Sequence, residues 1–128
     1  MRLKKVTFPN GGSHYLLNAQ INGQKASLIV DTGATDSVVT NKFLFDHNML
    51  DDMHESSRSV TGSNSIGPQK VMELRPKTPT VIGGWEIPGI RFLIMDMGAV
   101  REVYHVTQAP EKMDGLIGTD ILEKCGAI

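Results

Sequence analysis

The chain has 128 residues, of which 40% are hydrophobic and 21% charged, and its formal net charge is -1. This size suits one domain spanning residues 1–128, and the composition excludes a disordered chain. A nearly neutral charge gives no basis for a nucleic-acid partner, and no apolar run is long enough to cross a membrane, so we expect a cytoplasmic protein.

The first third of the chain predicts a β-hairpin. A short strand, Val6 to Phe8, comes first. His14 to Ile21 then alternates between apolar and polar residues, which is typical of a half-buried strand. Asn22-Gly23 is a strong signal for a two-residue hairpin turn. We therefore expect Gln24 to Val30 to return antiparallel to the preceding strand.

The middle of the chain predicts a strand, a short helix and a second hairpin. Val38 to Thr40 continues as a strand, and Thr40 or Asn41 is suited to cap a helix that runs to about His47 and buries Phe43 and Leu44. The polar stretch from Asp46 to Arg58 is interpreted as a loop. Ser59-Val60 and Gln69 to Leu74 would form a long hairpin, whose small polar tip suits either a mobile lid or an ordinary exposed turn.

The last third predicts short strands and one helix. Thr80 to Ile82 and Ile90 to Met95 are expected to be strands, joined by the Gly-rich segment 83–89. Asp96 to Lys112 is interpreted as irregular or as carrying one strand, Glu102 to Val106. The strand Leu116-Ile117-Gly118 leads into a helix, Thr119 to Lys124, with Gly126 just beyond its end.

The segment from Leu28 to Val39 carries the main chemical signal. An apolar, β-branched run ends in Asp31, which is followed by Thr32 and Gly33. Gly33 allows a positive φ or a close approach of backbone or ligand, and the threonine hydroxyl offers a hydrogen bond. A carboxylate held in this way at a strand end suits acid-base catalysis. The alternative is an ordinary strand exit in which the aspartate bonds the backbone two residues on.

The remaining reactive residues predict neither a metal nor a cofactor. The four histidines show no metal-binding spacing, and Cys125, the only cysteine, has no histidine beside it and is expected to be a small buried residue. Asp51-Asp52, His54 and Glu55 are interpreted as a solvated acidic loop. Trp85 is expected to be a core or rim anchor.

Two motifs together give the chain its resemblance. Ile29-Val30-Asp31-Thr32-Gly33-Ala34 and, far downstream, Leu116-Ile117-Gly118 before a short helix occur in the order seen in the retroviral-type, or retropepsin-like, aspartic proteases. The chain resembles this family over nearly its whole length. The resemblance implies a mostly β fold: a single-lobe acid-protease β-barrel with one or two short helices, active as a symmetric dimer.

The resemblance also implies a function. Hydrolysis by carboxylates needs two of them, and this chain has one Asp-Thr-Gly, so a homodimer would bring together one Asp31 from each subunit. Asp36, Asp114 and Asp120 lack that setting. Asp36 is expected to be a structural hydrogen-bond partner near the turn, and Asp114 is not expected to be the second acid.

By the same resemblance, each residue of the site has a role. Thr32 and Gly33 would support the dyad, Gly33 and Ala34 would line a groove for a peptide or protein substrate, and a flap at Thr61, Gly62 and Ser63 would cover it. The retroviral enzymes build an interface sheet from both chain ends, and here we expect the last strand to be short or missing.

Two other interpretations stay open. A catalytically inactive dimerisation or peptide-binding module could keep the same fold, and an unrelated β-barrel could carry the tripeptide by chance. The late Leu-Ile-Gly motif disfavours the second of these, and turnover of a peptide separates the first from a protease.

Overall fold

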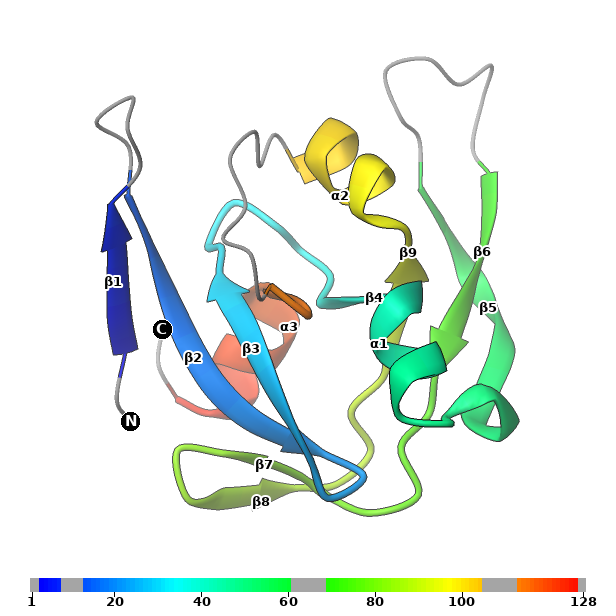
Figure 1. Ribbon diagram of the computed structural model, residues 1–128, viewed down its shortest axis with the longest axis horizontal. Coiled ribbons are helices and arrows are strands. Elements are labelled where there is room, and N and C mark those ends of the chain that lie inside the picture. Colours follow the sequence, from blue (N-terminus) through cyan, green and yellow to red (C-terminus); the bar gives the residue numbers. More distant parts are fainter. Residues whose placement is uncertain (1–2, 8–12, 61–68, 105–112, 127–128) are drawn as a thin grey trace.

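The computed structural model describes residues 3–7, 13–60, 69–104 and 113–126 (Figure 1). Its strands form a 10-stranded sheet in the order β5-β6-β9-β4-β10-β3-β2-β7-β8, with β1 paired to β2. The strands are β1 (Leu3–Thr7), β2 (Ser13–Ile21), β3 (Gln24–Val30), β4 (Val38–Thr40), β5 (Met53–Val60), β6 (Gln69–Leu74), β7 (Thr80–Ile82), β8 (Trp85–Ile87), β9 (Phe92–Met95) and β10 (Gly115–Ile117). The helices are α1 (Asn41–Asp46), α2 (Met97–Tyr104) and α3 (Thr119–Lys124), with a 3-10 turn η1 (Leu50–Asp52). This mostly β fold with short helices is the predicted fold class.

The β2–β3 hairpin is confirmed with its turn. Asn22 and Gly23 have φ values of 51° and 78°, which is the left-handed pair that a two-residue turn needs to match the twist of its strands. Ile21 pairs with Gln24, and the register then continues to Tyr15 opposite Val30. Leu17, Ala19 and Ile21 are buried, as their alternation predicts.

A strand from the far end of the sequence closes the centre of the sheet. β10 lies between β3, to which it is parallel, and β4, to which it is antiparallel. Gly115 permits this approach, because a Cβ at that position would collide with the carbonyl oxygen of Val38 and lie 2.9 Å from the Cα of Val39. The last residue of β3 is therefore held beside Ile117, and the next residue is Asp31.

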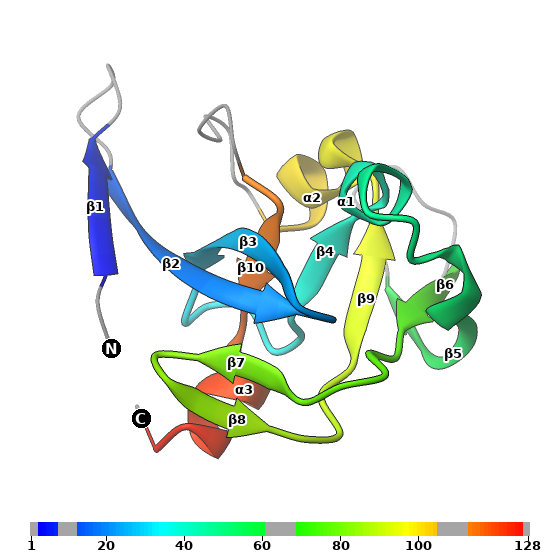
Figure 2. The ribbon, with the colours of Figure 1, turned by 60° about the horizontal axis from the view of Figure 1, so that its bottom comes forward.

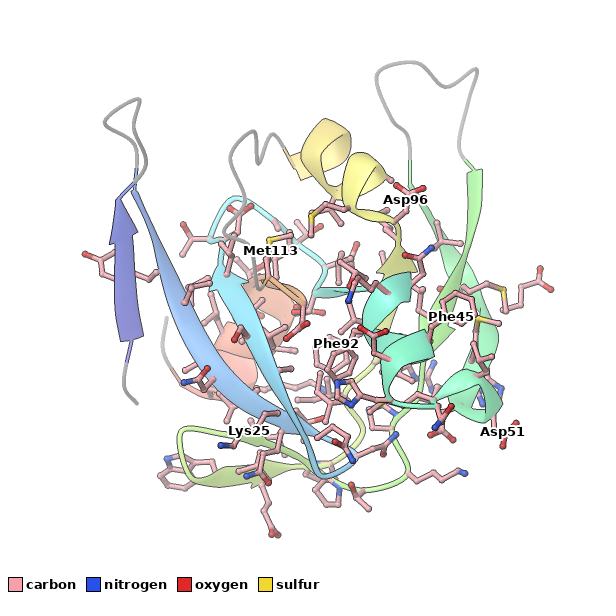
Figure 3. All side chains as sticks on the ribbon, in the orientation of Figure 1. Lys25, Phe45, Asp51, Phe92, Asp96 and Met113 are labelled. Atoms are coloured by element: carbon pink, nitrogen blue, oxygen red, sulfur yellow. The ribbon has the colours of Figure 1, made fainter. Side chains whose placement is uncertain are left out.

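Two apolar clusters pack against the sheet. The larger contains Leu28, Phe43 and Phe92 among others, with α1 and α3 contributing to it, and Figure 3 shows Phe92 at its centre. Thr40 caps α1 as expected, since its hydroxyl accepts a hydrogen bond from the backbone N–H of Phe43. The smaller cluster consists of Ile29, Ala34, Val38, Leu93, Met95, Val100, Met113 and Leu116; we call it the acid-side cluster.

Three segments differ from the sequence prediction. β5 begins at Met53, within the stretch that was expected to be a loop, and pairs antiparallel with β6 in the predicted second hairpin. β8 was not expected; the positive φ values of Gly83 and Gly84 fold it back onto β7. The stretch expected to be irregular or to carry a strand from Glu102 instead forms α2, and the rest of that predicted strand lies outside the described residues.

Figure 2 shows how the helices are distributed around the sheet. α2 lies above the carboxyl ends of β4 and β9, whereas α3 lies at the opposite side of the molecule, beneath β7. None of the helices in the described ranges is long and apolar enough to cross a membrane.

Candidate active site

Asp31 is fixed by backbone on both sides. Its N–H donates to the carbonyl oxygen of Ile117 over 2.9 Å, which extends the β3–β10 pairing by one residue. Its own carbonyl oxygen accepts from the N–H of Ala34 over 3.2 Å. One carboxylate oxygen, Oδ1, accepts from the N–H of Gly33 over 2.9 Å. The carboxyl group is half-buried, so it is both oriented and accessible.

Gly33 is required by space rather than by a left-handed backbone. It is not among the glycines with positive φ. A Cβ placed on it would lie 3.3 Å from Oδ1 of Asp31, tighter than most such contacts. Thr32 and Gly33 are both exposed beside the carboxylate, whereas the side chain of Ala34 is buried in the acid-side cluster. The structure thus brings together Asp31, Thr32 and Gly33 at one surface.

The segment after β10 holds the far side of this loop. The N–H of Thr119 donates to the carbonyl oxygen of Ala34 over 2.8 Å, and the N–H of Asp120 donates to that of Thr35 over 3.3 Å. Gly118 is close-packed against the loop, because a Cβ there would lie 2.7 Å from the Ala34 carbonyl oxygen. Gly118 of the Leu-Ile-Gly motif and the two residues after it therefore hold the Asp-Thr-Gly loop in place through main-chain contacts.

Ser37 and Asp120 form a buried polar link that sequence reasoning missed. The Ser37 hydroxyl donates to Oδ1 of Asp120 over 2.7 Å, and the Ser37 N–H donates to Oδ2 over 3.2 Å. The same hydroxyl accepts from the N–H of Gly118 over 2.9 Å. Ser37 is fully buried, so each bond satisfies a group that water cannot reach. The sequence did offer one signal for this link: Asp120 is an acidic residue in the first turn of α3, where a carboxylate is favoured.

Asp114 has a structural role. Its Oδ2 accepts from the N–H of Ser27 over 2.8 Å, while its own N–H donates to the Ser27 carbonyl oxygen over 2.8 Å. It therefore pins the start of β10 to β3, at the end of these strands away from Asp31. Asp36, the other acidic residue considered, is half-buried in the loop.

The proposed flap residues, Thr61, Gly62 and Ser63, lie outside the described residues. What the structure does describe is the pair of strands that lead into and out of this segment. Val60 pairs with Gln69, so the antiparallel ladder of β5 and β6 reaches the last described residue on each side.

The acidic loop at residues 51–55 was misinterpreted in part. Asp52 is buried, with 6% exposure. Its Oδ2 accepts from the side-chain amide of Asn22 over 2.8 Å, and Lys77 Nζ lies 3.5 Å from its Oδ1. A partner distant in sequence therefore compensates the buried charge, which local composition could not reveal. Asp51 and His54 are exposed, as expected of a solvated segment.

Among the described residues, Cys125 and Trp85 do not indicate a second reactive site. Burial raises the pKa of the Cys125 thiol, which disfavours the thiolate that a nucleophilic cysteine needs. Cys125 is only half-buried at the edge of the main core, rather than fully buried as predicted. Trp85 is 74% exposed, so of the two alternatives, a core or a rim anchor, the core is excluded. Within the described ranges, no three acidic, histidine or cysteine side chains are placed to hold a metal ion.

A cleft of about 880 Å³ lies elsewhere on the sheet. Lys25, Lys42 and Asp114 line it, whereas Asp31, Thr32 and Gly33 do not.

Comparison with known proteins gives a consistent assignment. A family model described as aspartyl protease matches residues 17–121. Among solved structures, a retropepsin-like aspartic protease from Rickettsia conorii superposes with a TM-score of 0.60 at 20% identity, covering 96% of this chain and 81% of that one. The retroviral protease-like domain of Ddi1 from Leishmania major gives a TM-score of 0.52 at 21% identity, covering 85% of this chain and 70% of that one.

A viral enzyme shares the fold as well. EIAV protease, in complex with the inhibitor HBY-793, gives a TM-score of 0.50 at 24% identity and covers 94% of this chain and 95% of the other. At these identities the structural likeness establishes the fold. Comparison with curated proteins gives no match.

Proposed function

The chain belongs to the aspartyl protease family, and on this basis we propose that it is an aspartic endopeptidase whose catalytic pair consists of Asp31 from each of two identical subunits. The observation that carries this proposal is the site itself. Asp31 is half-buried at a strand end, and backbone bonds to Ile117 and Gly33 fix its orientation. A second carboxylate is all that the chemistry still requires.

A two-fold axis is the simplest source of that second carboxylate. Asp114 and Asp120 are both engaged in structural hydrogen bonds away from the acid. In a symmetric dimer the same surface meets itself, so a residue close to the axis lies close to its own copy. Two carboxyl groups about 3 Å apart cannot both ionise, so the pair shares one proton. The ionised member activates a water, and the protonated member donates to the peptide carbonyl oxygen.

The neighbours of Asp31 have distinct roles in this proposal. Thr32 is exposed beside the acid and braces the pair across the dimer. Gly33 keeps the surface over Asp31 flat, which lets an extended peptide approach the carboxylates closely. Ala34 supports the groove from below, because its side chain is buried. Thr61, Gly62 and Ser63, carried by the β5–β6 hairpin, cover a peptide that binds as an added strand.

The test is cleavage of a diverse peptide pool, followed by mass spectrometry from acid to neutral pH. We expect the parent to cut the pool and Asp31→Asn to lose at least about a thousandfold in rate, because an amide cannot take up the proton of water. The surface variant Asp51→Asn removes an exposed carboxyl outside the site and should cut like the parent. Figure 3 shows Asp51 at the edge of the molecule, on η1.

Two outcomes would count against an Asp31 protease. Equal cleavage by the parent and Asp31→Asn would mean that another group, or a contaminant, cuts the peptides. Absence of cleavage by a parent that forms dimers would transfer support to the inactive peptide-binding module. Native mass spectrometry of the same samples identifies the dimer.

A further inference from the structure

The acid-side cluster lies on the face of β3 from which Asp31 projects. Successive residues of a strand point to opposite faces, so Ile29 and Asp31, two positions apart, share a face. Ile29 belongs to the acid-side cluster, whereas its neighbour Leu28 belongs to the main core on the other face. Ala34, three residues after the acid, completes the apolar surface beside it. A peptide bound at Asp31 must therefore meet this face.

In the structure, helix α2 occupies that apolar surface. Val100 is fully buried in the acid-side cluster, and Met97 and Ala99 pack partly buried against it. Figure 1 shows α2 directly after the arrowhead of β9, the strand that carries Leu93 and Met95 of the cluster. Figure 3 shows Met113, the last member of the cluster before β10, beneath the helix. With α2 in place, Ile29, Val38 and Leu116 are each 0% exposed.

The contacts that the structure describes for α2 are local or apolar. Asp96 caps the helix: its carboxylate accepts from the N–H of Ala99 over 2.6 Å, and its carbonyl oxygen accepts from that of Val100 over 3.0 Å. Both bonds lie within the segment that forms the helix, so neither ties it to the sheet. An eight-residue helix is marginal by itself. Among the described side chains of α2, those of Val100, Met97 and Ala99 hold the helix against the sheet.

We propose that α2 is a self-inhibitory cover, in which Val100 fills the apolar subsite beside Asp31 that a large side chain of the substrate would occupy. The inference rests on the proposed peptidase function, because that function supplies the peptide. An extended peptide alternates its side chains between two faces, so one next to the acid points into the acid-side cluster. It enters only when Val100 leaves, so the apparent affinity equals the intrinsic affinity multiplied by the fraction of molecules that are open.

The first experiment follows amide hydrogen exchange of the full chain, with and without a pool of reduced-amide hexapeptides that carry leucine or phenylalanine at the centre. These peptides bind but cannot be cut. We expect the exchange rate of the amides within 97–104 to rise about tenfold when peptide binds, because the peptide displaces the helix from the acid-side cluster. The amides of β3 and β10 should stay protected. Unchanged or slower exchange in α2 when peptide is bound would overturn the proposal, as would failure of the whole pool to bind.

A matched pair of variants tests the role of Val100. Val100→Ala and Val39→Ala each remove the same atoms from a fully buried valine, one in the acid-side cluster and one in the main core. Only Val100→Ala should bind the pool more tightly, by about tenfold, because it weakens the closed state. Equal affinities for the two variants would overturn the proposal. Failure of catalysis is seen separately, as binding of ordinary peptides that are never cut.

Discussion

Asp31 owes its position to residues that are far away in sequence. The carbonyl oxygen of Ile117 accepts a hydrogen bond from the N–H of Asp31, and the N–H of Thr119 donates to the carbonyl oxygen of Ala34. Gly118 packs closely against the backbone of Ala34. Each of these contacts uses main-chain atoms, so the loop is fixed by geometry and not by particular side chains. Ser37 and Asp120 are the exception, since they link the two segments through polar side chains inside the protein. At the residue scale, we therefore expect substitutions of Ser37 and Asp120 to have the largest effect on stability within this site.

We expect Asp120→Ala to destabilise the protein by about 1–3 kcal/mol, because it leaves the N–H and hydroxyl of buried Ser37 without their acceptor. Ser37→Ala removes the hydroxyl that donates to Asp120, the other partner of the same bond. Because the two residues share one network, the double variant should lose less stability than the sum of the single variants. Urea unfolding of the four proteins measures the difference.

The control for this cycle lies on the same helix. Glu123 is exposed on α3, and Glu123→Ala should change the free energy of unfolding by no more than about 0.5 kcal/mol. If the losses of unfolding free energy for Asp120→Ala and Ser37→Ala simply add in the double variant, the interaction between the two side chains does not stabilise the protein.

The sequence located the candidate acid, Asp31, but not the residues that support it. Asp31 and Gly33 could be found because local patterns, an apolar run and a Gly turn, define a strand end. The partners of Ser37 and Asp52 could not, because each lies far along the chain, 83 residues away for Ser37 and 30 for Asp52. Composition placed Asp52 in a solvated loop, and only the fold brings the amide of Asn22 to it. Interactions between distant segments are what a single sequence leaves undetermined.

At the element scale, the β2–β3 turn has a second role beyond joining two strands. Asn22 donates to Asp52 on η1, and its Oδ1 accepts from the N–H groups of Lys77 and Thr78 over 2.7 Å and 3.3 Å. The turn therefore fastens the hairpin that carries Asp31 to η1 and to the connection between β6 and β7. One side chain couples three elements.

We expect Asn22→Gly to lower the free energy of unfolding by about 1–3 kcal/mol, because it removes these bonds and leaves the buried carboxylate of Asp52 without its amide donor. Asn22→Ala should cost about 1 kcal/mol more, because alanine resists the φ of 51°. Urea unfolding measures both variants.

Asn48 provides the matched control for Asn22. It has a similar φ of 54° and is exposed, so Asn48→Gly should be close to neutral. If Asn22→Gly were equally neutral, the side-chain bonds of the turn would not stabilise the protein.

The elements that sequence located most accurately are those with local signals at both ends. β3, β4 and α3 have the predicted bounds, and Thr40 caps α1 as expected. α2 was missed because a glycine and two valines weaken its helical pattern, although Asp96 was an available capping signal. The first part of β5, Met53 to Arg58, was missed because its residues are mostly polar, as an edge strand that meets solvent on one side allows.

At the scale of the whole molecule, the proposed dyad means that activity requires two subunits, each with an intact Asp31. If parent is mixed with an equal amount of Asp31→Asn and the subunits exchange, about half of the parent chains pair with an inactive partner, so activity per parent chain should fall by about half. A ninefold excess of the variant should reduce it to about one tenth. Cleavage rates at fixed parent concentration measure this.

The control for mixing uses an intact acid. Asp51→Asn added in the same excess keeps Asp31 and should not reduce activity. If Asp31→Asn in excess also left the activity unchanged, each chain would have to act with its own residues alone, and the shared dyad would be excluded.

The pairing of β3 with β10 also has a kinetic consequence. Residues 28–30 are matched to residues 115–117, so closing this ladder requires a long loop of chain to be ordered first, and such distant pairings form slowly. During synthesis, the first hairpin can form as soon as residue 30 has emerged, but the acid loop has no partner until residues 115–120 follow. The geometry of the loop around Asp31 is therefore completed only after residues 115–120 have been synthesised, and a chain that stops before them cannot present Asp31 as the structure shows it.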